Sequence, residues 1–378
     1  MNAEKVRQGG LLSFLNAREG HRVELLRTGS EALSRLEALA GQARHEILLA
    51  CYIVADDAVG RRIEKTLTDA VRRGVDVKVV IDGFGSLPIA LDPWPSFRAA
   101  GGRIEVWEPF RLWKNGWGFW RRDHRKFLVI DGGTGLLGGM NLTEDYDRTV
   151  ADGGMVDRAI ELEGPGVYDL ARLFDRTWSW ITKEKERPRT IPPPVPGGVR
   201  VAIEGNGKFR DRHRIARAYR EAIRAADQSI VLENPYFLPD RGIRRHMRNA
   251  LRRGVSVTAV LPQATDARFV DLASRALWGR LREAGVALHI DPAFLHAKLA
   301  LFDLDRVILG SCNLDHRSLF HNLEVVAFVE SPGLAGQIRE EVDRDLSRST
   351  LLDLDAWKKR PRLERWIEHL LFGFRLWF

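Results

Sequence analysis

The sequence predicts an α/β protein built from two repeated halves that pack as a pseudo-two-fold unit around one shared site. Three observations support this prediction. A short motif of chemically active residue types occurs twice, the segments upstream of each copy also repeat, and a proline- and glycine-rich stretch separates the copies. Repetition of this kind indicates duplicated structural units. A chain of 378 residues can supply two units that each bury a core.

The motif reads "HRKFLVIDGGTGLLGGMN" from His124 and "HAKLALFDLDRVILGSCN" from His296. Both copies place histidine, lysine, aspartate, a glycine or serine, and asparagine at the same spacing. These positions are His124, Lys126, Asp131, Gly139 and Asn141 in the first copy, and His296, Lys298, Asp303, Ser311 and Asn313 in the second. A chance match in one register at so many polar positions is not expected.

The repeat extends upstream of the motif. "RRGV" occurs at 72–75 and 252–255, and "FRAAG" at 97–101 matches "LREAG" at 281–285. The strand-like runs "VDVKVVID" and "VSVTAVLP" follow helix-like segments in each half. Alternation of strand and helix is typical of an α/β layer fold.

The stretch "KEKERPRTIPPPVPGGV" is charged and then rich in proline and glycine, so we expect it to connect the halves. The predicted organisation is an N-terminal half at 1–186, a linker at 187–198, a C-terminal half at 199–350 and an amphipathic tail at 351–378. Two independent domains with separate sites are the alternative. A shared site is favoured because one His-Lys pair makes only half of the machinery described below.

The composition limits the partners and the setting. The net charge of +8 favours an anionic partner, and phospholipid, nucleic acid or an acidic membrane surface would all fit. Cys51 and Cys312 are far apart, which suits a reducing compartment, and no metal or cofactor is expected. No apolar run is long enough to span a bilayer, so membrane contact is expected to be peripheral, at the cytoplasmic face.

The spacing within the motif predicts which side chains act together. Residues two apart on a strand face the same side, so each histidine should project with its lysine. Asp131 and Asp303 lie at an odd offset and are expected to anchor the strand end and the turn. Backbone amides near Gly139 and Ser311, with the amides of the two asparagines, are candidates to bind a phosphate.

Two facing histidines suit phosphodiester exchange through a covalent intermediate. One neutral imidazole attacks phosphorus, and the other, protonated, donates to the leaving alkoxide. The two lysines and two asparagines would neutralise the phosphoryl oxygens without a metal. A carboxylate hydrogen-bonded to the nitrogen of each imidazole that does not react would hold the ring in the correct orientation. Asp157 and Glu324 are the candidates, although each could be an ordinary strand-end residue.

The paired motifs resemble the phospholipase D superfamily, and the flanking segments "AIELEGPGV", "ENPYFLPD" and "GSCNLDHRSLFHNLE" resemble bacterial cardiolipin synthases of the short, B-like type. The resemblance implies two α/β/α halves around one site. It also implies transfer of a phosphatidyl group between two phosphatidylglycerol molecules through a phosphatidyl-histidine, without a metal. By resemblance, the catalytic set includes both motif aspartates, His124 is the nucleophile and His296 the acid and base. Many cardiolipin synthases begin with two transmembrane segments, and the sequence predicts none for this chain.

Other functions remain open at this stage. Hydrolysis of a phospholipid to phosphatidate uses the same chemistry with water as the acceptor. A metal-independent nuclease would also suit the positive charge, and the aromatic and basic segment before the first motif could stack bases. Nucleic acid is nevertheless not expected as the partner, because the apolar stripe near the C-terminus would have no use there.

Two segments are candidates for membrane contact. One mixes aromatic and cationic residues, and its alternative is a buried aromatic cluster: Phe110, Arg111, Trp113, Lys114, Trp117, Phe119, Trp120, Arg121 and Arg122. The other has apolar residues at helical spacing, and it could lie in the membrane interface or pack on the protein: Leu363, Trp366, Ile367, Leu370, Leu371, Phe374 and Trp377.

Overall fold

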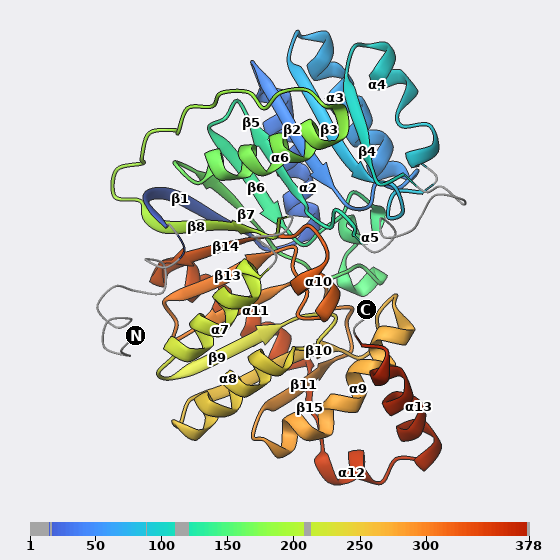
Figure 1. Cartoon of the computed structure of the whole chain (residues 1–378), viewed down its shortest axis with the longest axis vertical. Coiled ribbons are helices and arrows are strands. Elements are labelled where there is room, and N and C mark those ends of the chain that lie inside the picture. Colours follow the sequence, from blue (N-terminus) through green and yellow to red (C-terminus); the bar gives the residue numbers. More distant parts are fainter. Residues whose placement is uncertain (1–14, 16, 88, 110–120, 208–212, 376–378) are drawn as a thin grey trace.

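The computed structural model describes residues 15, 17–87, 89–109, 121–207 and 213–375. Within this part of the chain, the strands form a 15-stranded sheet with helices packed on its faces (Figure 1). The strand order is β15-β11-β10-β9-β12-β13-β14-β8-β1-β7-β6-β5-β2-β3-β4. The α/β fold class predicted from the sequence is confirmed.

The N-terminal half contributes the blue to green part of Figure 1. Its strands are β1 (Arg18–Leu26), β2 (Glu46–Cys51), β3 (Asp76–Asp82), β4 (Arg103–Trp107), β5 (Phe127–Ile130), β6 (Thr134–Gly138) and β7 (Ala159–Glu163). Its helices are α2 (Gly29–Gln42), α3 (Ala58–Arg72), α4 (Pro95–Ala99), α5 (Glu144–Asp147) and α6 (Val167–Thr182).

The C-terminal half repeats this plan. Its strands are β8 (Val199–Gly205), β9 (Ser229–Glu233), β10 (Ser256–Pro262), β11 (Ala287–Asp291), β12 (Leu299–Phe302), β13 (Arg306–Gly310), β14 (Val325–Glu330) and β15 (Thr350–Leu351). Its helices are α7 (Arg214–Ala225), α8 (Arg241–Arg252), α9 (Arg268–Glu283), α10 (His316–Phe320), α11 (Pro332–Arg348), α12 (Leu354–Lys358) and α13 (Arg362–Gly373).

The sheet itself displays the duplication. Reading outward from its centre, the N-terminal half runs β1-β7-β6-β5-β2-β3-β4, and the C-terminal half runs β8-β14-β13-β12-β9-β10-β11. Strands β1 and β8 pair antiparallel at the centre, where Arg18 faces Val201 and His21 faces Val199. Strand β8 begins where the linker was expected to end. The sheet therefore joins the two repeats edge to edge.

The two halves also share a core. One cluster of buried apolar residues includes Phe174 of α6 and Ile338 of α11, together with Val129 of β5 and Leu301 of β12. Strands β5 and β12 are buried along their whole length, which agrees with their uninterrupted apolar sequences. Because burial of this core needs both repeats, the fold does not fit two independent domains.

The segment after residue 350 packs on the C-terminal half. Strand β15 extends the sheet by pairing antiparallel with β11, and α13 packs along α9 (Figure 1). The Trp357 ring of α12 stacks on Trp278, with the ring centroids 5.2 Å apart. The tail thus continues the fold, and the boundary proposed at 351 falls inside β15.

Candidate active site

The two motif histidines lie immediately before β5 and β12, and each is held by the opposite half. The backbone N–H of His124 donates to the carbonyl oxygen of Leu323 at 2.9 Å, and that of His296 donates to Val156 at 2.7 Å. Parallel bridges join Asp123 to Leu323 and Val156 to Leu295. The residue that follows each cross-half anchor is a carboxylate, Glu324 or Asp157.

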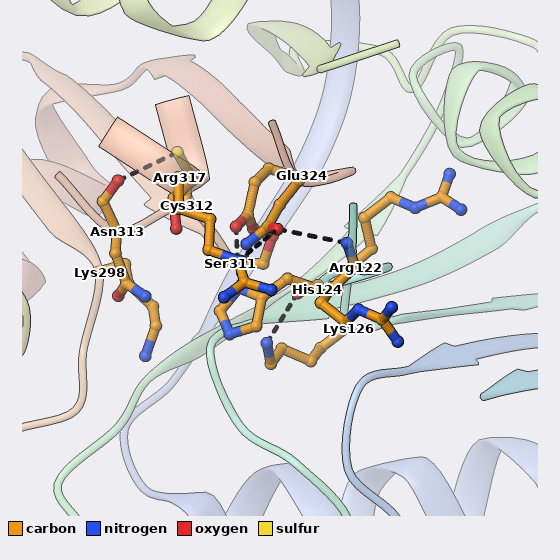
Figure 2. Close-up of polar contacts among 12 residues, drawn as sticks. Arg122, His124, Lys126, Lys298, Ser311, Cys312, Asn313, Arg317 and Glu324 are labelled. Carbon is orange, nitrogen blue, oxygen red and sulfur yellow. Dashed lines mark hydrogen bonds and ion pairs between the residues drawn. The ribbon is translucent and has the colours of Figure 1, made fainter. Parts of the chain in front are cut away.

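Glu324 binds the first histidine. Its carboxylate lies 2.9 Å from Nδ1 of His124, and its side chain is fully buried. The Ser311 hydroxyl donates to the other carboxylate oxygen at 2.5 Å (Figure 2). A carboxylate on Nδ1 fixes the proton there and leaves Nε2 as the nucleophilic or proton-donating atom. The Nε2 atom of His124 is therefore the one available for chemistry.

Asp157 binds the second histidine in the same way, with Oδ2 2.7 Å from Nδ1 of His296. The immediate surroundings differ from those of the first histidine. Gly139 occupies the position equivalent to Ser311, and a Cβ atom there would lie 2.6 Å from an Asp157 oxygen. The glycine leaves room for the shorter carboxylate, whereas the serine hydroxyl binds the longer one.

The two lysines are buried beside the rings. The Lys126 ammonium donates to the backbone oxygen of its own motif histidine, His124, at 2.7 Å, and it lies 5.1 Å from the centre of the Tyr52 ring. The Lys298 ammonium lies 2.6 Å from Nδ1 and 2.9 Å from Nε2 of His296. Burial lowers the pKa of Lys126 to about 8 and that of Lys298 to about 7. Two cations with this little water around them form a strong site for an anion.

The same burial favours the neutral form of each histidine. Burial, and then the positive charges of the lysines, hold the pKa of His124 well below its usual value. Burial and then Lys298 lower the pKa of His296 as well, although Asp157 opposes the shift. Burial also raises the pKa of Glu324 to about 8. The His124 imidazole and the Glu324 carboxyl are therefore driven towards sharing one proton.

The motif asparagines have different environments. The Asn141 amide donates to the Tyr146 hydroxyl at 3.0 Å and accepts from the backbone N–H of Ile53 at 3.2 Å, so one amide hydrogen remains for a phosphate. The amide oxygen of Asn313 is buried without a hydrogen-bond partner among the described residues. The repeat predicted equal roles, but the protein contacts of the two amides are unequal.

The motif aspartates point away from this chemistry, and their inclusion in the catalytic set is corrected. The Asp131 carboxylate accepts the backbone N–H groups of residues 44–46 at 2.8–2.9 Å, and Asp303 accepts those of residues 227–229. Both occupy the left-handed region, with φ of 50°, in the turns after β5 and β12. Burial acts to raise the pKa of Asp131, but the backbone donors hold it below its ordinary value. As the odd offset predicted, they anchor strand ends.

This role predicts a stability defect without a catalytic one. We expect Asp303→Ala to lower the free energy of unfolding by about 1–3 kcal/mol, because several backbone N–H groups lose their acceptor. Urea denaturation measures the change, and Asp305→Ala, an exposed residue of the same turn, is the matched control. At a temperature where both variants are folded, turnover should remain within threefold of the starting protein. A large loss of turnover in a fully folded Asp303→Ala protein would contradict the structural role.

The sequence analysis did not identify two residues that lie near the histidines. The Tyr146 hydroxyl lies 3.1 Å from Nδ1 of His296. Asp82 is fully buried and accepts the backbone N–H of Asp123 at 2.9 Å, which fixes the chain just before His124. Burial raises the pKa of Asp82 to about 6. Neither has a chemically similar counterpart in the repeat, where Ser318 and Pro262 stand, so a search by repetition passed over them.

The aromatic and basic segment is described only in part. Residues 110–120 lie outside the described residues, so the membrane contact of this segment stays a prediction. Arg122 is 4 % exposed, and its guanidinium lies 3.5 Å from Asp82. For this residue the interfacial interpretation is wrong, because a buried carboxylate partner holds the guanidinium inside the protein.

In the described ranges, no group of three or more His, Cys, Asp and Glu side chains is arranged to hold a metal ion. Across the same ranges, the helices are too short or too polar for any of them to cross a membrane.

Comparison with known proteins identifies the family. The profile described as "Cardiolipin synthase, PLD-like domain" matches residues 36–162 and 219–346, one match in each repeat. The chain belongs to this family of the phospholipase D superfamily. Cardiolipin synthase 1 of Staphylococcus epidermidis is 29% identical over 352 residues, covering 91% of this chain and 71% of the relative. Cardiolipin synthase A of Yersinia pseudotuberculosis is 28% identical over 377 residues, covering 95% of this chain and 76% of the relative.

Solved structures support the fold. Phosphatidylserine synthase from Haemophilus influenzae superposes with a TM-score of 0.77 at 13% identity and covers 99% of this chain and 100% of its own. Polyphosphate kinase from Porphyromonas gingivalis gives a TM-score of 0.59 at 18% identity, covering 99% of this chain and 56% of its own. Members of the cardiolipin synthase family are phosphatidyltransferases, so this family membership places the chain among enzymes.

Proposed function

We propose that this chain is a cardiolipin synthase that transfers a phosphatidyl group from one phosphatidylglycerol to another and releases glycerol. The observation that carries the proposal is the reciprocal pairing of the histidines. Each motif imidazole is hydrogen-bonded at Nδ1 to a buried carboxylate of the opposite half, within 3 Å. Two such imidazoles with two buried lysines supply a nucleophile, an acid and a binding site for the phosphate.

In the proposed first step, Nε2 of His124 attacks phosphorus and the bond to the glycerol headgroup breaks. The imidazolium of His296 donates its proton to the glycerol alkoxide, so glycerol leaves neutral. A phosphatidyl-histidine remains. In the second step, His296 removes the proton of a hydroxyl on a second phosphatidylglycerol, whose oxygen attacks phosphorus as the bond between phosphorus and Nε2 of His124 breaks. Cardiolipin is released and both histidines return to their starting states.

The substrate itself supplies the charge that this cycle needs. A phosphodiester carries one negative charge, and its entry beside Lys126 and Lys298 favours the protonated form of both lysines. The same charge favours an imidazolium at His296, whose pKa burial otherwise lowers. The Tyr146 hydroxyl and Asp157 both contact that ring, whereas Ser311 acts on the carboxylate of the other pair. This difference supports unequal roles for the two histidines.

The substrate resides in a bilayer, so we also propose peripheral contact with an anionic membrane at its cytoplasmic face. The α13 helix supports this proposal. Its Leu371 and Phe372 pack against the core, while Leu363 and Trp366 are 67 % and 62 % exposed. The two interpretations of this helix are thus compatible, because one side packs on the protein and the other is free to contact lipid.

A product assay tests the proposed function. We expect the purified protein, incubated with phosphatidylglycerol in mixed micelles, to form cardiolipin and glycerol in equal amounts. The His124→Ala protein should form neither product. Phosphatidate without cardiolipin would replace transfer with hydrolysis. Cleavage of single-stranded DNA at the same enzyme concentration, with no lipid product, would favour a nuclease.

A further inference from the structure

A groove between α8 and α9 has an apolar floor and an arginine rim. Its rim is formed by Arg244, Arg248 and Arg280 and its floor by Leu251, Leu277 and Leu281, around a volume of about 220 Å³. Arg244 also borders an adjoining pocket with Arg241, Arg245 and Asp240. None of these residues belongs to the two motifs or contacts the motif histidines.

The rim arginines form no close ion pair with a carboxylate among the described residues. Within the described part of the chain, Arg220 pairs with Asp240, but no hydrogen bond or ion pair holds the side chains of Arg244, Arg248 or Arg280. Arg244 is half-buried, and its pKa is lowered by burial and then by the positive charge of Arg375, although Asp240 opposes the shift. Like charges gathered over a partly desolvated surface destabilise one another until an anion joins them.

The groove lies near the C-terminal end of α13. This helix packs along α9 (Figure 1). Arg375, which follows the helix, lies close enough to Arg244 for its positive charge to lower the pKa of Arg244. Beyond Leu363 and Trp366, the stripe continues with Leu370 and Phe374, which are 49 % and 52 % exposed. Unpaired arginines beside an exposed apolar stripe match the two layers of a membrane interface, phosphate and acyl chain.

We propose that the groove between α8 and α9 binds the headgroup phosphate of an anionic phospholipid in a bilayer, at a docking site separate from the catalytic histidines. Pockets that enclose a drug-sized ligand measure about 300–1,000 Å³, so this groove is too small for a whole phospholipid. The groove can hold the phosphate of a phospholipid and the first atoms of its acyl chains, while the rest of the lipid stays in the membrane. The inference rests on the proposed function only in that the substrate lies in such a bilayer.

The test uses the full chain with Arg244, Arg248 and Arg280 all changed to glutamine. Each basic side chain near an anionic surface contributes about fivefold to binding, so we expect about 100-fold weaker binding to vesicles of phosphatidylcholine with one-fifth phosphatidylglycerol. The matched control changes Arg44, Arg98 and Arg176 to glutamine. These three arginines are exposed and lie in the N-terminal half, and their replacement removes the same net charge as the triple variant. The control should bind within threefold of the starting protein.

A second measurement separates this inference from the proposed function. Turnover of short-chain phosphatidylglycerol, kept below its micelle concentration, should be equal in the triple variant and the starting protein. If no variant forms cardiolipin but the triple variant still binds vesicles more weakly than its control, only the proposed function is contradicted. Equal vesicle binding by the triple variant and its control would overturn the docking site. Loss of binding to a single-stranded oligonucleotide, with vesicle binding intact, would reassign the groove to nucleic acid.

Discussion

Replacing His124 or His296 with alanine is expected to lower cardiolipin formation by about 10⁴-fold or more in each case. Removal of a nucleophile or its partner acid from a cooperating set typically costs about 10⁴–10⁶ in turnover. Initial rates in mixed micelles measure the loss. The control is His369→Ala, because this histidine is exposed on α13 and, among the described residues, its side chain bonds to the backbone oxygen of Arg365 alone. Full activity in either site variant would refute a mechanism that needs both imidazoles.

The same variants identify the nucleophile. Brief incubation with phosphatidylglycerol labelled at phosphorus, followed by denaturation in alkali, should leave label on the peptide that contains His124. The label should be absent from the His124→Ala protein. In the His296→Ala protein the label should accumulate slowly, since the leaving glycerol lacks its acid but attack remains possible. Label on the peptide containing His296 would reverse the two roles.

The second large effect is expected from the carboxylates that hold the rings. Replacing Glu324 with glutamine, or Asp157 with asparagine, keeps the shape but removes the charge that fixes the Nδ1 proton. In a comparable serine protease triad this change lowers turnover by about 10⁴-fold, and we expect a loss of at least about 100-fold here. The loss should appear in kcat with little change in KM, because neither carboxylate is expected to contact the substrate.

Two further variants make this result specific. Ser311→Ala, which removes one hydrogen bond to Glu324, should lower kcat by only about tenfold, in line with about 1.4 kcal/mol for one such bond. Glu330→Gln changes a strand residue of the same type, on β14, and should leave kcat unchanged. If the Glu324→Gln protein kept the starting kcat, the carboxylate would have no part in orienting His124.

The sequence predicted the parts of the site that are local and repeated. The geometry of an extended strand predicted that histidine and lysine two apart act together and that an aspartate at an odd offset does not, and both copies agree. The histidines and lysines themselves lie just before β5 and β12 rather than on them. Asp157 and Glu324 were named as candidates to orient the histidines. Which histidine each would bind was not predicted, because the pairing depends on bridges between Asp123 and Leu323 and between Val156 and Leu295 that only the tertiary fold creates.

Residues without a repeated counterpart were the ones missed. Tyr146 and Asp82 act on one histidine each, and their positions in the other repeat hold Ser318 and Pro262. A comparison between the halves finds what the two have in common, whereas unequal roles require differences. The unequal hydrogen bonding of Asn141 and Asn313 has the same origin, because Tyr146 is present on one side only.

The reciprocal hold of each histidine by the opposite repeat has a consequence for how such a protein could arise. Neither half by itself contains a complete catalytic pair, since its imidazole would lack the buried acid that orients it. A single ancestral repeat could therefore have worked only as a symmetric dimer. Fusing two copies into one chain would have preserved that chemistry while freeing each copy to diverge, as Gly139 and Ser311 have done.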